Sequence, residues 1–146
     1  MDDVKTRLLE TARAAQAHAY ARYSHFKVGA ALLADDGKIY GGANVENASY
    51  PEGLCAEASA IGAMITGGGR RIREFLIIAD GLLLCPPCGA CRQRIREFAD
   101  DETPVHLAGP QGHRHTFRLA DLLPVSFGAA NLLATPAHGS TQAVEC

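Results

Sequence analysis

The chain has 146 residues, of which 47% are hydrophobic and 21% are charged, and its formal net charge is −2. Such a length and composition are typical of one globular domain with a single hydrophobic core. The small negative charge gives no support for binding to nucleic acid or to a membrane surface, and no apolar run is long enough to cross a bilayer.

The N-terminal residues and the cysteines indicate a cellular compartment. Met1–Lys5 is acidic and lacks the apolar stretch of a signal peptide, so we expect a cytoplasmic protein. Five cysteines in such a chain favour metal binding or catalysis over disulfides. Two of the five, Cys85 and Cys146, are expected to be free thiols.

The N-terminal third of the chain predicts a helix followed by a β-hairpin. Apolar residues recur at helical spacing from Asp3 to Arg22, which predicts an amphipathic helix that covers a sheet. Phe26–Ala34 is an apolar run of strand length, Asp36-Gly37 is a tight-turn signal, and Lys38–Val45 predicts the returning strand. Gly41-Gly42 within that strand indicates a bulge or a close approach of another backbone.

Polar side chains occupy the end of the second predicted strand, from Asn44 to Asn47. A polar turn is the simplest interpretation of this stretch. However, strand ends in α/β sheets are where ligands bind. Asn44 and Glu46 are two residues apart, so both point to one side of an extended segment. An amide and a carboxylate placed in this way could hold a sugar hydroxyl.

The second half of the chain predicts alternating helices and strands. In chain order these are a buried helix Cys55–Thr66, a strand Phe75–Ala79, a helix Cys88–Phe98, a strand Val105–Ala108, and a short strand and helical turn within Phe117–Leu123. This order predicts an α/β fold, a three-layer α/β/α sandwich with a mixed sheet of about five strands. We expect one domain over residues 1–133 and a disordered tail over 134–146, which lacks apolar periodicity.

Three cysteines predict a metal site. Cys88 and Cys91 are three residues apart, so they lie on one face of a first helical turn and can bind one ion. Cys55 would supply a third ligand from a separate element. Three protein ligands leave the fourth tetrahedral position of Zn²⁺ open for water, as in catalytic zinc sites. Glu57 lies two residues after Cys55, which suits a general acid/base beside the metal that is not itself a ligand.

Two other interpretations use the same residues. Cys85 could supply a fourth thiolate and close the site into a structural zinc centre. Cys85-Pro86-Pro87-Cys88 could instead be a redox C-x-x-C motif. A structural site would leave Glu57 without a role, and the redox motif would need Cys88, which the zinc site already uses. We therefore favour an open catalytic site with Cys85 unbound.

The chain resembles the small, homotetrameric zinc-dependent cytidine deaminases over most of its length. The matching stretches are Tyr23–Ala31, Asn44–Tyr50, Cys55–Glu57, Pro87–Gln93, and Leu122–Pro124 with Phe127-Gly128. Among related enzymes, nucleotide, tRNA and guanine deaminases more often have His-x-Glu in place of Cys55-Ala56-Glu57. A blasticidin-type deaminase should lack the full run from Asn44 to Tyr50. The cytidine deaminases are therefore the preferred family.

The resemblance implies a reaction. It is the hydrolytic deamination of cytidine, and of deoxycytidine, to uridine or deoxyuridine and ammonia, in pyrimidine salvage. Zinc-bound hydroxide would attack C4 of the base, and Glu57 would shuttle protons to N3 and to the leaving amino group. The substrate would be a small pyrimidine nucleoside.

The resemblance also implies the contacts to that substrate. Phe26 would pack against the pyrimidine ring, Asn44 and Glu46 would bind the ribose 3′-hydroxyl, and the backbone of Ala56 would bind the base carbonyl. In a homotetramer with shared active sites, two aromatic residues would reach a neighbour's site, Tyr50 to enclose the sugar and Phe127 from near the C-terminus.

Two positions depart from the family pattern. Ala58 stands where an arginine usually follows the catalytic glutamate, and Pro86 stands where a serine usually precedes the Pro-Cys pair. Three thiolates on Zn²⁺ leave a net charge near −1, which the usual arginine would offset. We expect the N-termini of two helices or another arginine to compensate, and Arg92 and Arg94 are the nearest arginines in sequence.

Overall fold

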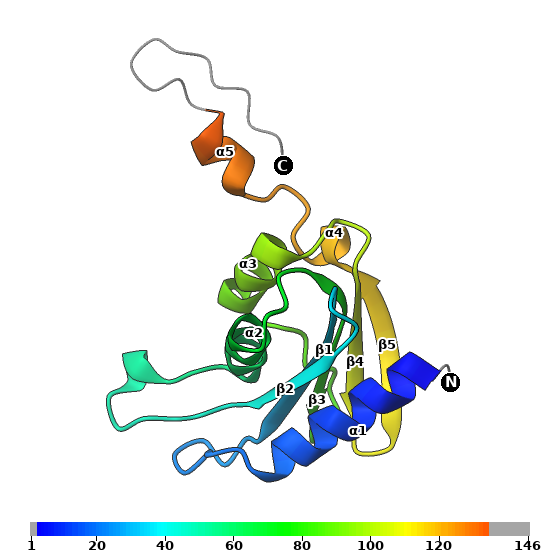
Figure 1. Cartoon of the computed structure of the whole chain (residues 1–146). Coiled ribbons are helices and arrows are strands. Elements are labelled where there is room, and N and C mark those ends of the chain that lie inside the picture. Colours follow the sequence, from blue (N-terminus) through cyan, green and yellow to red (C-terminus); the bar gives the residue numbers. More distant parts are fainter. Residues whose placement is uncertain (1–2, 135–146) are drawn as a thin grey trace.

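The computed structural model describes residues 3–134 (Figure 1). Its elements in chain order are α1 (Asp3–Ala17), β1 (Val28–Ala34), β2 (Ile39–Ala43), the 3₁₀ turn η1 (Tyr50–Glu52), α2 (Ala56–Thr66), β3 (Ile72–Ala79), α3 (Gly89–Phe98), β4 (Pro104–Gly109), β5 (Gly112–Arg118), α4 (Leu119–Leu122) and α5 (Ala129–Leu133). The strands form one sheet in the order β2-β1-β3-β4-β5. Only the β3–β4 pair is parallel among the sheet pairs of residues 3–134. The predicted α/β class with a mixed five-stranded sheet is confirmed.

Helices cover both faces of the sheet because its central strands are apolar on both faces. On one face, Leu8 and Ala12 of α1 pack on a buried cluster that includes Leu76 and Ile78 of β3. The alternate residues of β3 point to the other face, where Phe75 and Ile77 belong to a larger cluster with residues of α2 and α3. The result is the expected three layers, and the zinc motif lies in the layer formed by α2 and α3 (Figure 1).

The first helix is shorter than the sequence indicates. The prediction of a helix to Arg22 is wrong at its C-terminal end, since α1 stops at Ala17. The chain turns extended at Tyr20, whose N–H donates to the Asn44 carbonyl and whose carbonyl accepts from the Glu46 N–H. Pairing with a segment 25 residues further on thus overrides the helical pattern. This pairing places residues 20–28 beside the end of β2.

The predicted hairpin is confirmed, with β1 and β2 paired antiparallel around a turn at Gly37, whose φ is +80°. The register from Gly29–Ala43 to Leu33–Ile39 is continuous, so β2 has no bulge. Gly42 instead allows a close approach, because a Cβ there would clash with the backbone of Ala60 in α2. Gly42 thus lets α2, and with it the Cys55 end of that helix, lie directly against the sheet, whereas a Cβ on Gly41 would meet Thr11 and Ala15 of α1.

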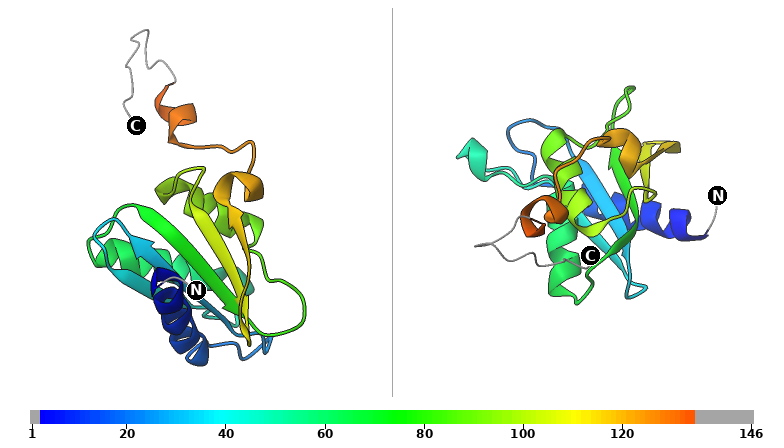
Figure 2. Two further views of the ribbon diagram at one scale, coloured as in Figure 1. Left: turned by 90° about the vertical axis from the view of Figure 1, so that its right-hand side faces the viewer. Right: turned by 90° about the horizontal axis from the view of Figure 1, so that it is seen from above.

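The C-terminal region contains an element that the sequence did not predict. Helix α5 has no buried residue and stands apart from the sheet (Figure 2). The predicted tail, 134–146, lies outside the described residues except for Ala134. No helix within residues 3–134 is long and apolar enough to span a membrane.

Candidate zinc centre and substrate pocket

The three predicted zinc ligands converge. The Sγ atoms of Cys55, Cys88 and Cys91 all lie within 4.8 Å of one another, and they form the only such metal-ligand group among the described residues. A zinc–sulfur bond is about 2.3 Å, so three sulfurs at tetrahedral angles around one ion lie about 3.8 Å apart. The donor set therefore fits Zn²⁺ with small side-chain adjustments, and it leaves one coordination position for a ligand that is not protein.

Two of the ligands are placed by helix N-termini. Cys55 is the N-cap of α2 and Cys88 is the N-cap of α3. N-caps are usually Ser, Thr, Asp or Asn, whose side chains accept a bond from the first turn. Neither cysteine makes such a cap bond, so each thiol is free to turn toward the metal. The positive ends of both helix dipoles point at the site, where they favour negative charge.

Glu57 lies in the first turn of α2 and is only 5% exposed. Burial raises the pKa of its carboxyl above the ordinary value of a glutamate, against smaller effects in the opposite direction that include the charge of Arg94. Glu57 also lines the same pocket as Cys55 and Cys88. A buried glutamate beside an open metal position can exchange protons with a metal ligand or a substrate, as predicted for this residue.

The thiols show why this site needs a cation. Burial raises the pKa of Cys55 and of Cys91, and the negative charge of Glu57 acts in the same direction on both. Burial works against ionisation of Cys88 too, but hydrogen bonds from the backbone and thiol of Cys91 and from Cys55 lower its pKa. Three adjacent thiolates would therefore repel one another without a bound metal, and a divalent cation removes that cost.

Cys85 lies outside this group. Its thiol is not one of the three that come within 4.8 Å of one another, although it lines the neighbouring pocket. The described geometry therefore does not support a closed site with four thiolates. Cys85 forms no disulfide, in keeping with the prediction of a free thiol, whereas Cys146 lies outside the described residues.

A pocket of about 420 Å³ opens beside the thiols. Its volume is within the usual range for small-molecule sites. Its walls contain Glu57, two of the three predicted zinc ligands and most of the residues predicted to contact the substrate: Phe26, Asn44, Glu46, Tyr50, Cys55, Ala56, Glu57 and Cys88. Residues from four separate segments of the chain are thus brought to one cavity.

Asn44 and Glu46 fix the backbone beside this pocket. The Asn44 side chain accepts from the Val28 N–H at 2.9 Å and donates to the Phe26 carbonyl at 2.9 Å. Glu46 accepts from the N–H groups of Tyr23 and Ser24 at 2.8 and 3.0 Å, and from the Ser24 hydroxyl. These bonds, the Ser24 hydroxyl above all, lower the pKa of Glu46. Each side chain keeps hydrogen-bonding capacity for a ligand.

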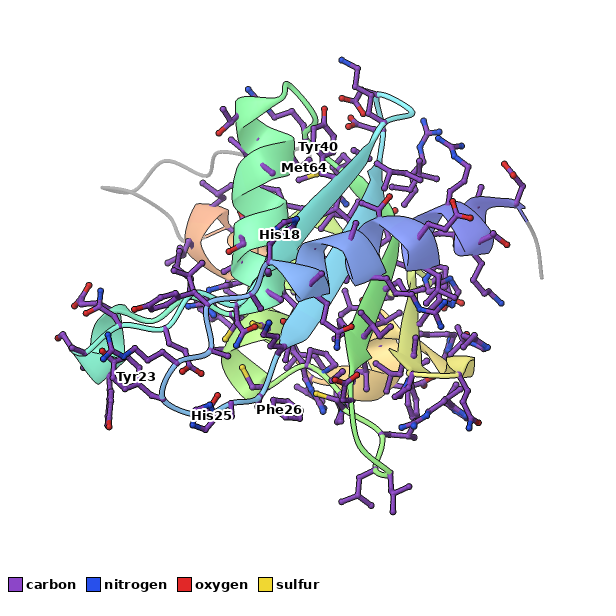
Figure 3. The ribbon with its side chains drawn as sticks, turned by 90° about the horizontal axis from the view of Figure 1, so that it is seen from below. His18, Tyr23, His25, Phe26, Tyr40 and Met64 are labelled. Atoms are coloured by element: carbon purple, nitrogen blue, oxygen red, sulfur yellow. The ribbon has the colours of Figure 1, made fainter. Side chains whose placement is uncertain are left out.

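Phe26 is held at the pocket by this network. Figure 3 shows Tyr23, His25 and Phe26 at one end of the sheet, opposite Tyr40 and Met64. His25 has a φ of +58°, a left-handed conformation that turns the chain just before Phe26. Phe26 is 45% exposed, which is unusual for a core aromatic and suits a residue that meets a ligand.

The arm that carries Tyr50 projects from the body of the molecule. Val45 and Leu54 pair antiparallel at the base of this arm, and η1 forms its tip (Figure 1). Tyr50 is 77% exposed, and its ring meets Tyr23 edge-on, with 6.0 Å between centroids. The arm therefore presents aromatic surface that its own chain leaves largely uncovered.

Phe127 does not reach the pocket of its own chain and is 56% exposed. It lies in the segment before α5, which α3 holds through two bonds. Gln93 donates to the Phe127 carbonyl at 2.8 Å, and Arg96 donates to the Ser126 hydroxyl at 2.9 Å. The position of this ring leaves it available to another molecule.

Sequence reasoning assigned no role to several residues of this site. Ser24 binds Glu46, and Ile77 and Pro86 line the pocket. The Tyr23-Ser24 pair stood among the family-like stretches and could have drawn attention to Ser24. The sequence pattern of Ile77 is that of any buried strand residue, so nothing in the sequence distinguished it.

Comparisons with known proteins agree with this geometry. Residues 2–107 match the family model described as the cytidine and deoxycytidylate deaminase zinc-binding region. A cytidine deaminase of Sporosarcina psychrophila is 40% identical over 126 residues, which is 86% of this chain and 93% of that protein. One from Mycobacterium tuberculosis is 43% identical over 135 residues, which is 90% of this chain and 96% of the relative.

A solved structure agrees with these sequence comparisons. The crystal structure of cytidine deaminase from Burkholderia pseudomallei superposes with a TM-score of 0.80 and 40% identity, covering 87% of this chain and all of that one (100%). The two proteins therefore agree over nearly their whole length, in the fold as well as in the zinc motif. The three converging thiols and the buried Glu57 are consistent with these matches. The chain therefore belongs to the cytidine and deoxycytidylate deaminase zinc-binding family, whose cofactor is Zn²⁺.

Proposed function

We propose that the protein hydrolytically deaminates cytidine and deoxycytidine to uridine and deoxyuridine, with release of ammonia. The observation that carries this proposal is the shared pocket, in which the buried Glu57 and the zinc thiols face Asn44 and Glu46. The cytidine deaminases that it resembles over nearly their whole length support the same substrate class.

The chemistry divides between the metal and Glu57. When held by Cys55, Cys88 and Cys91, Zn²⁺ would lower the pKa of a coordinated water toward 7 and so supply a nucleophile at neutral pH. Glu57 accepts the proton of the attacking water and passes it to N3 of the base, which makes C4 more electrophilic. After the carbon–oxygen bond forms at C4, Glu57 takes the remaining proton from the new C4 hydroxyl, which becomes the C4 carbonyl of the product, and delivers it to the amino group. The C4–N bond then breaks and ammonia leaves with the electron pair.

The pocket walls would orient the nucleoside. Phe26 packs on the pyrimidine ring, and the N–H of Ala56, at the start of α2, donates to the base carbonyl. Asn44 donates its remaining amide hydrogen to the ribose 3′-hydroxyl, and Glu46 accepts from the same group. Two observations support these roles. All four residues line the same pocket. The hydrogen bonds that Asn44 and Glu46 make within the protein leave each side chain able to form a further hydrogen bond to a ligand.

We infer a homotetramer in which neighbours complete the active sites. Tyr50 is part of the wall of its own chain's pocket, and its exposed ring also encloses the sugar bound by an adjacent subunit, while Phe127 reaches a neighbour's pocket. The exposure of both aromatic rings, 77% and 56%, supports this arrangement. Large exposed aromatics on a projecting arm and beside α5 would be unfavourable in a monomer.

The cellular setting follows from the proposed chemistry. The catalytic domain spans residues 1–133, and the protein works in the cytoplasm in pyrimidine salvage, where free nucleosides are recovered. A neutral nucleoside suits a chain whose formal net charge is only −2. Neither nucleic acid nor a membrane is a partner in this proposal.

One experiment tests the substrate assignment. The purified, zinc-loaded protein is incubated separately with cytidine, deoxycytidine and deoxycytidylate, and ammonia is measured together with the absorbance change of the base. We expect turnover of both nucleosides and little turnover of the nucleotide. Zinc-loaded protein that acts on deoxycytidylate alone, or on none of the three, would contradict the proposal.

A further inference from the structure

Three arginines on α3 have different partners. Arg92 donates to the carbonyls of Pro87 and Leu122, each at 2.8 Å, and Arg96 donates to the Ser126 hydroxyl. Arg94 alone among the three points at the metal centre, where its Nη1 donates to the Sγ of Cys91 at 3.6 Å. Arg92 therefore binds the backbone, whereas Arg94 contacts the predicted zinc ligand Cys91.

Helix geometry explains this contact. Cys91 and Arg94 are three residues apart on α3, so their side chains lie on the same face. Cys91 is fully buried, with 0% exposure, whereas Arg94 is an exposed residue. The guanidinium thus covers the sulfur from the solvent side. Its charge also acts on Glu57, where it opposes the effect of burial on the carboxyl.

The zinc centre has a charge that this contact can offset. Three thiolates and one Zn²⁺ sum to −1. The helix dipoles compensate in part, each with about half a unit of positive charge. The neighbour of Glu57 on α2 is Ala58, a half-buried residue with no charge. The Arg94 guanidinium adds a full positive charge and an N–H···S bond, and bonds to a charged partner are stronger than neutral ones.

We propose that Arg94 is a positioning residue of the zinc centre, which fixes the Cys91 thiolate through its N–H···S bond and offsets the net charge of the zinc–thiolate cluster. As a consequence, the protein loses zinc more slowly than it would without the Arg94 side chain. The proposal rests on the zinc enzyme proposed above, but it concerns how firmly the metal is held and does not depend on which nucleoside is deaminated.

Zinc release to an excess of a chromogenic chelator tests the proposal. Groups that support metal ligands typically contribute ten- to a hundredfold to metal affinity. Solvent screens an exposed guanidinium, so we expect Arg94→Ala to release zinc about tenfold faster than the parent. Arg94→Lys keeps the charge and should fall between the two. Arg96→Ala, which removes the same charge from the same helix, should release zinc at the parent rate.

Cobalt substitution gives a second readout. With Co²⁺ in the site, loss of the N–H···S bond makes the Cys91 sulfur a better electron donor. The thiolate-to-cobalt absorption of Arg94→Ala should therefore move to longer wavelength, and that of Arg96→Ala should not. A change in fold alone, checked by circular dichroism, would not produce this selective shift.

Several results would overturn the proposal. Parent-like zinc release by Arg94→Ala, or equal acceleration by Arg96→Ala, would show that Arg94 has no special relation to the metal. Release by Arg94→Lys as fast as by Arg94→Ala would exclude charge compensation. None of these measurements uses a nucleoside, so a failure of the proposed substrate would be seen separately, in the deamination assay.

Discussion

The two halves of the site are built in different ways. The metal half consists of the three cysteines and Glu57, and it is placed by the first turns of two helices that pack on the sheet. The proposed nucleoside half consists of Phe26, Asn44, Glu46 and Tyr50, which line the pocket, and of Phe127, which lies outside the pocket of its own chain. It lies on connecting segments, and its aromatic rings are 45% to 77% exposed. Packing within one chain fixes the metal half, whereas polar bonds fix part of the nucleoside half and its outer wall remains open.

This difference predicts how substitutions behave. Changes in the metal half should act on chemistry or zinc content, because its side chains already have their final neighbours. Changes in the nucleoside half should act on substrate binding and on local stability.

The largest effect is expected for Glu57→Gln. Glutamine has nearly the same shape but cannot carry the proton, and a general acid/base contributes about a hundred- to ten-thousandfold to a rate. We expect kcat to fall by about a thousandfold while zinc content and folding stay at parent levels. Steady-state kinetics and metal analysis measure both.

Glu97→Gln is a suitable control, because it makes the same change at an exposed position of α3. It should leave kcat unchanged. If Glu57→Gln kept turnover within a few-fold of the parent, Glu57 would not be the proton carrier.

A smaller effect is expected for Glu46→Gln in the nucleoside half. Hydrogen bonds to a charged group contribute about 1.5–3 kcal/mol, so losing the one to the ribose should raise KM by about tenfold or more. Zinc content should not change. Glu52→Gln, an exposed change on the same arm, is the matched control and should leave KM unchanged.

Glu46 also predicts a pH dependence of stability. Its pKa is lowered in the folded protein by Ser24 and the neighbouring backbone, so the ionised form favours folding. That contribution is present above about pH 4.3, the ordinary value for glutamate, and is lost as the pH falls through the lower folded-state pKa. The difference in melting temperature between the parent and Glu46→Gln should therefore shrink below about pH 4.3. A difference that grows on acidification would mean that Ser24 does not stabilise the carboxylate.

No loss of zinc is expected for Cys85→Ser. The thiol of Cys85 lies outside the ligand group, so metal analysis should find one zinc per chain in both variant and parent. Cys91→Ser is the positive control, because it removes a ligand and should lower zinc content. Zinc loss in Cys85→Ser would restore the closed, four-thiolate interpretation.

The same division explains what the sequence could and could not predict. The zinc ligands follow from local rules, since Cys88 and Cys91 share one helical turn and Cys55 begins another helix. The sheet followed from apolar runs of strand length. In contrast, the end of α1 depends on the pairing of Tyr20 with Val45, a long-range contact that a helical pattern does not reveal. Helix α5 is five residues long, too short for apolar residues to recur at helical spacing, so no periodic pattern marks it in the sequence.

Side-chain partners were the least predictable feature. Arg92 and Arg94 looked alike in the sequence, yet one binds backbone carbonyls and the other a cysteine sulfur. The contacts of Asn44 and Glu46 with residues 23–28 likewise appear only once the chain is folded. Sequence spacing indicates which residues share a face, but tertiary packing decides what each side chain meets.

Subunit complementation tests most directly whether the metal half is complete in one chain while a neighbour completes the nucleoside half. One partner carries Glu57→Gln, with Tyr50 and Phe127 intact. The other carries Tyr50→Ala and Phe127→Ala, with its metal half intact. Each is assayed alone and after co-expression as mixed oligomers, at equal total protein. If the aromatics act across subunits, mixed oligomers contain complete sites, and cytidine deamination should rise well above the sum of the two separate proteins. Activity equal to that sum, in oligomers shown to contain both chains, would mean that each chain completes its own site.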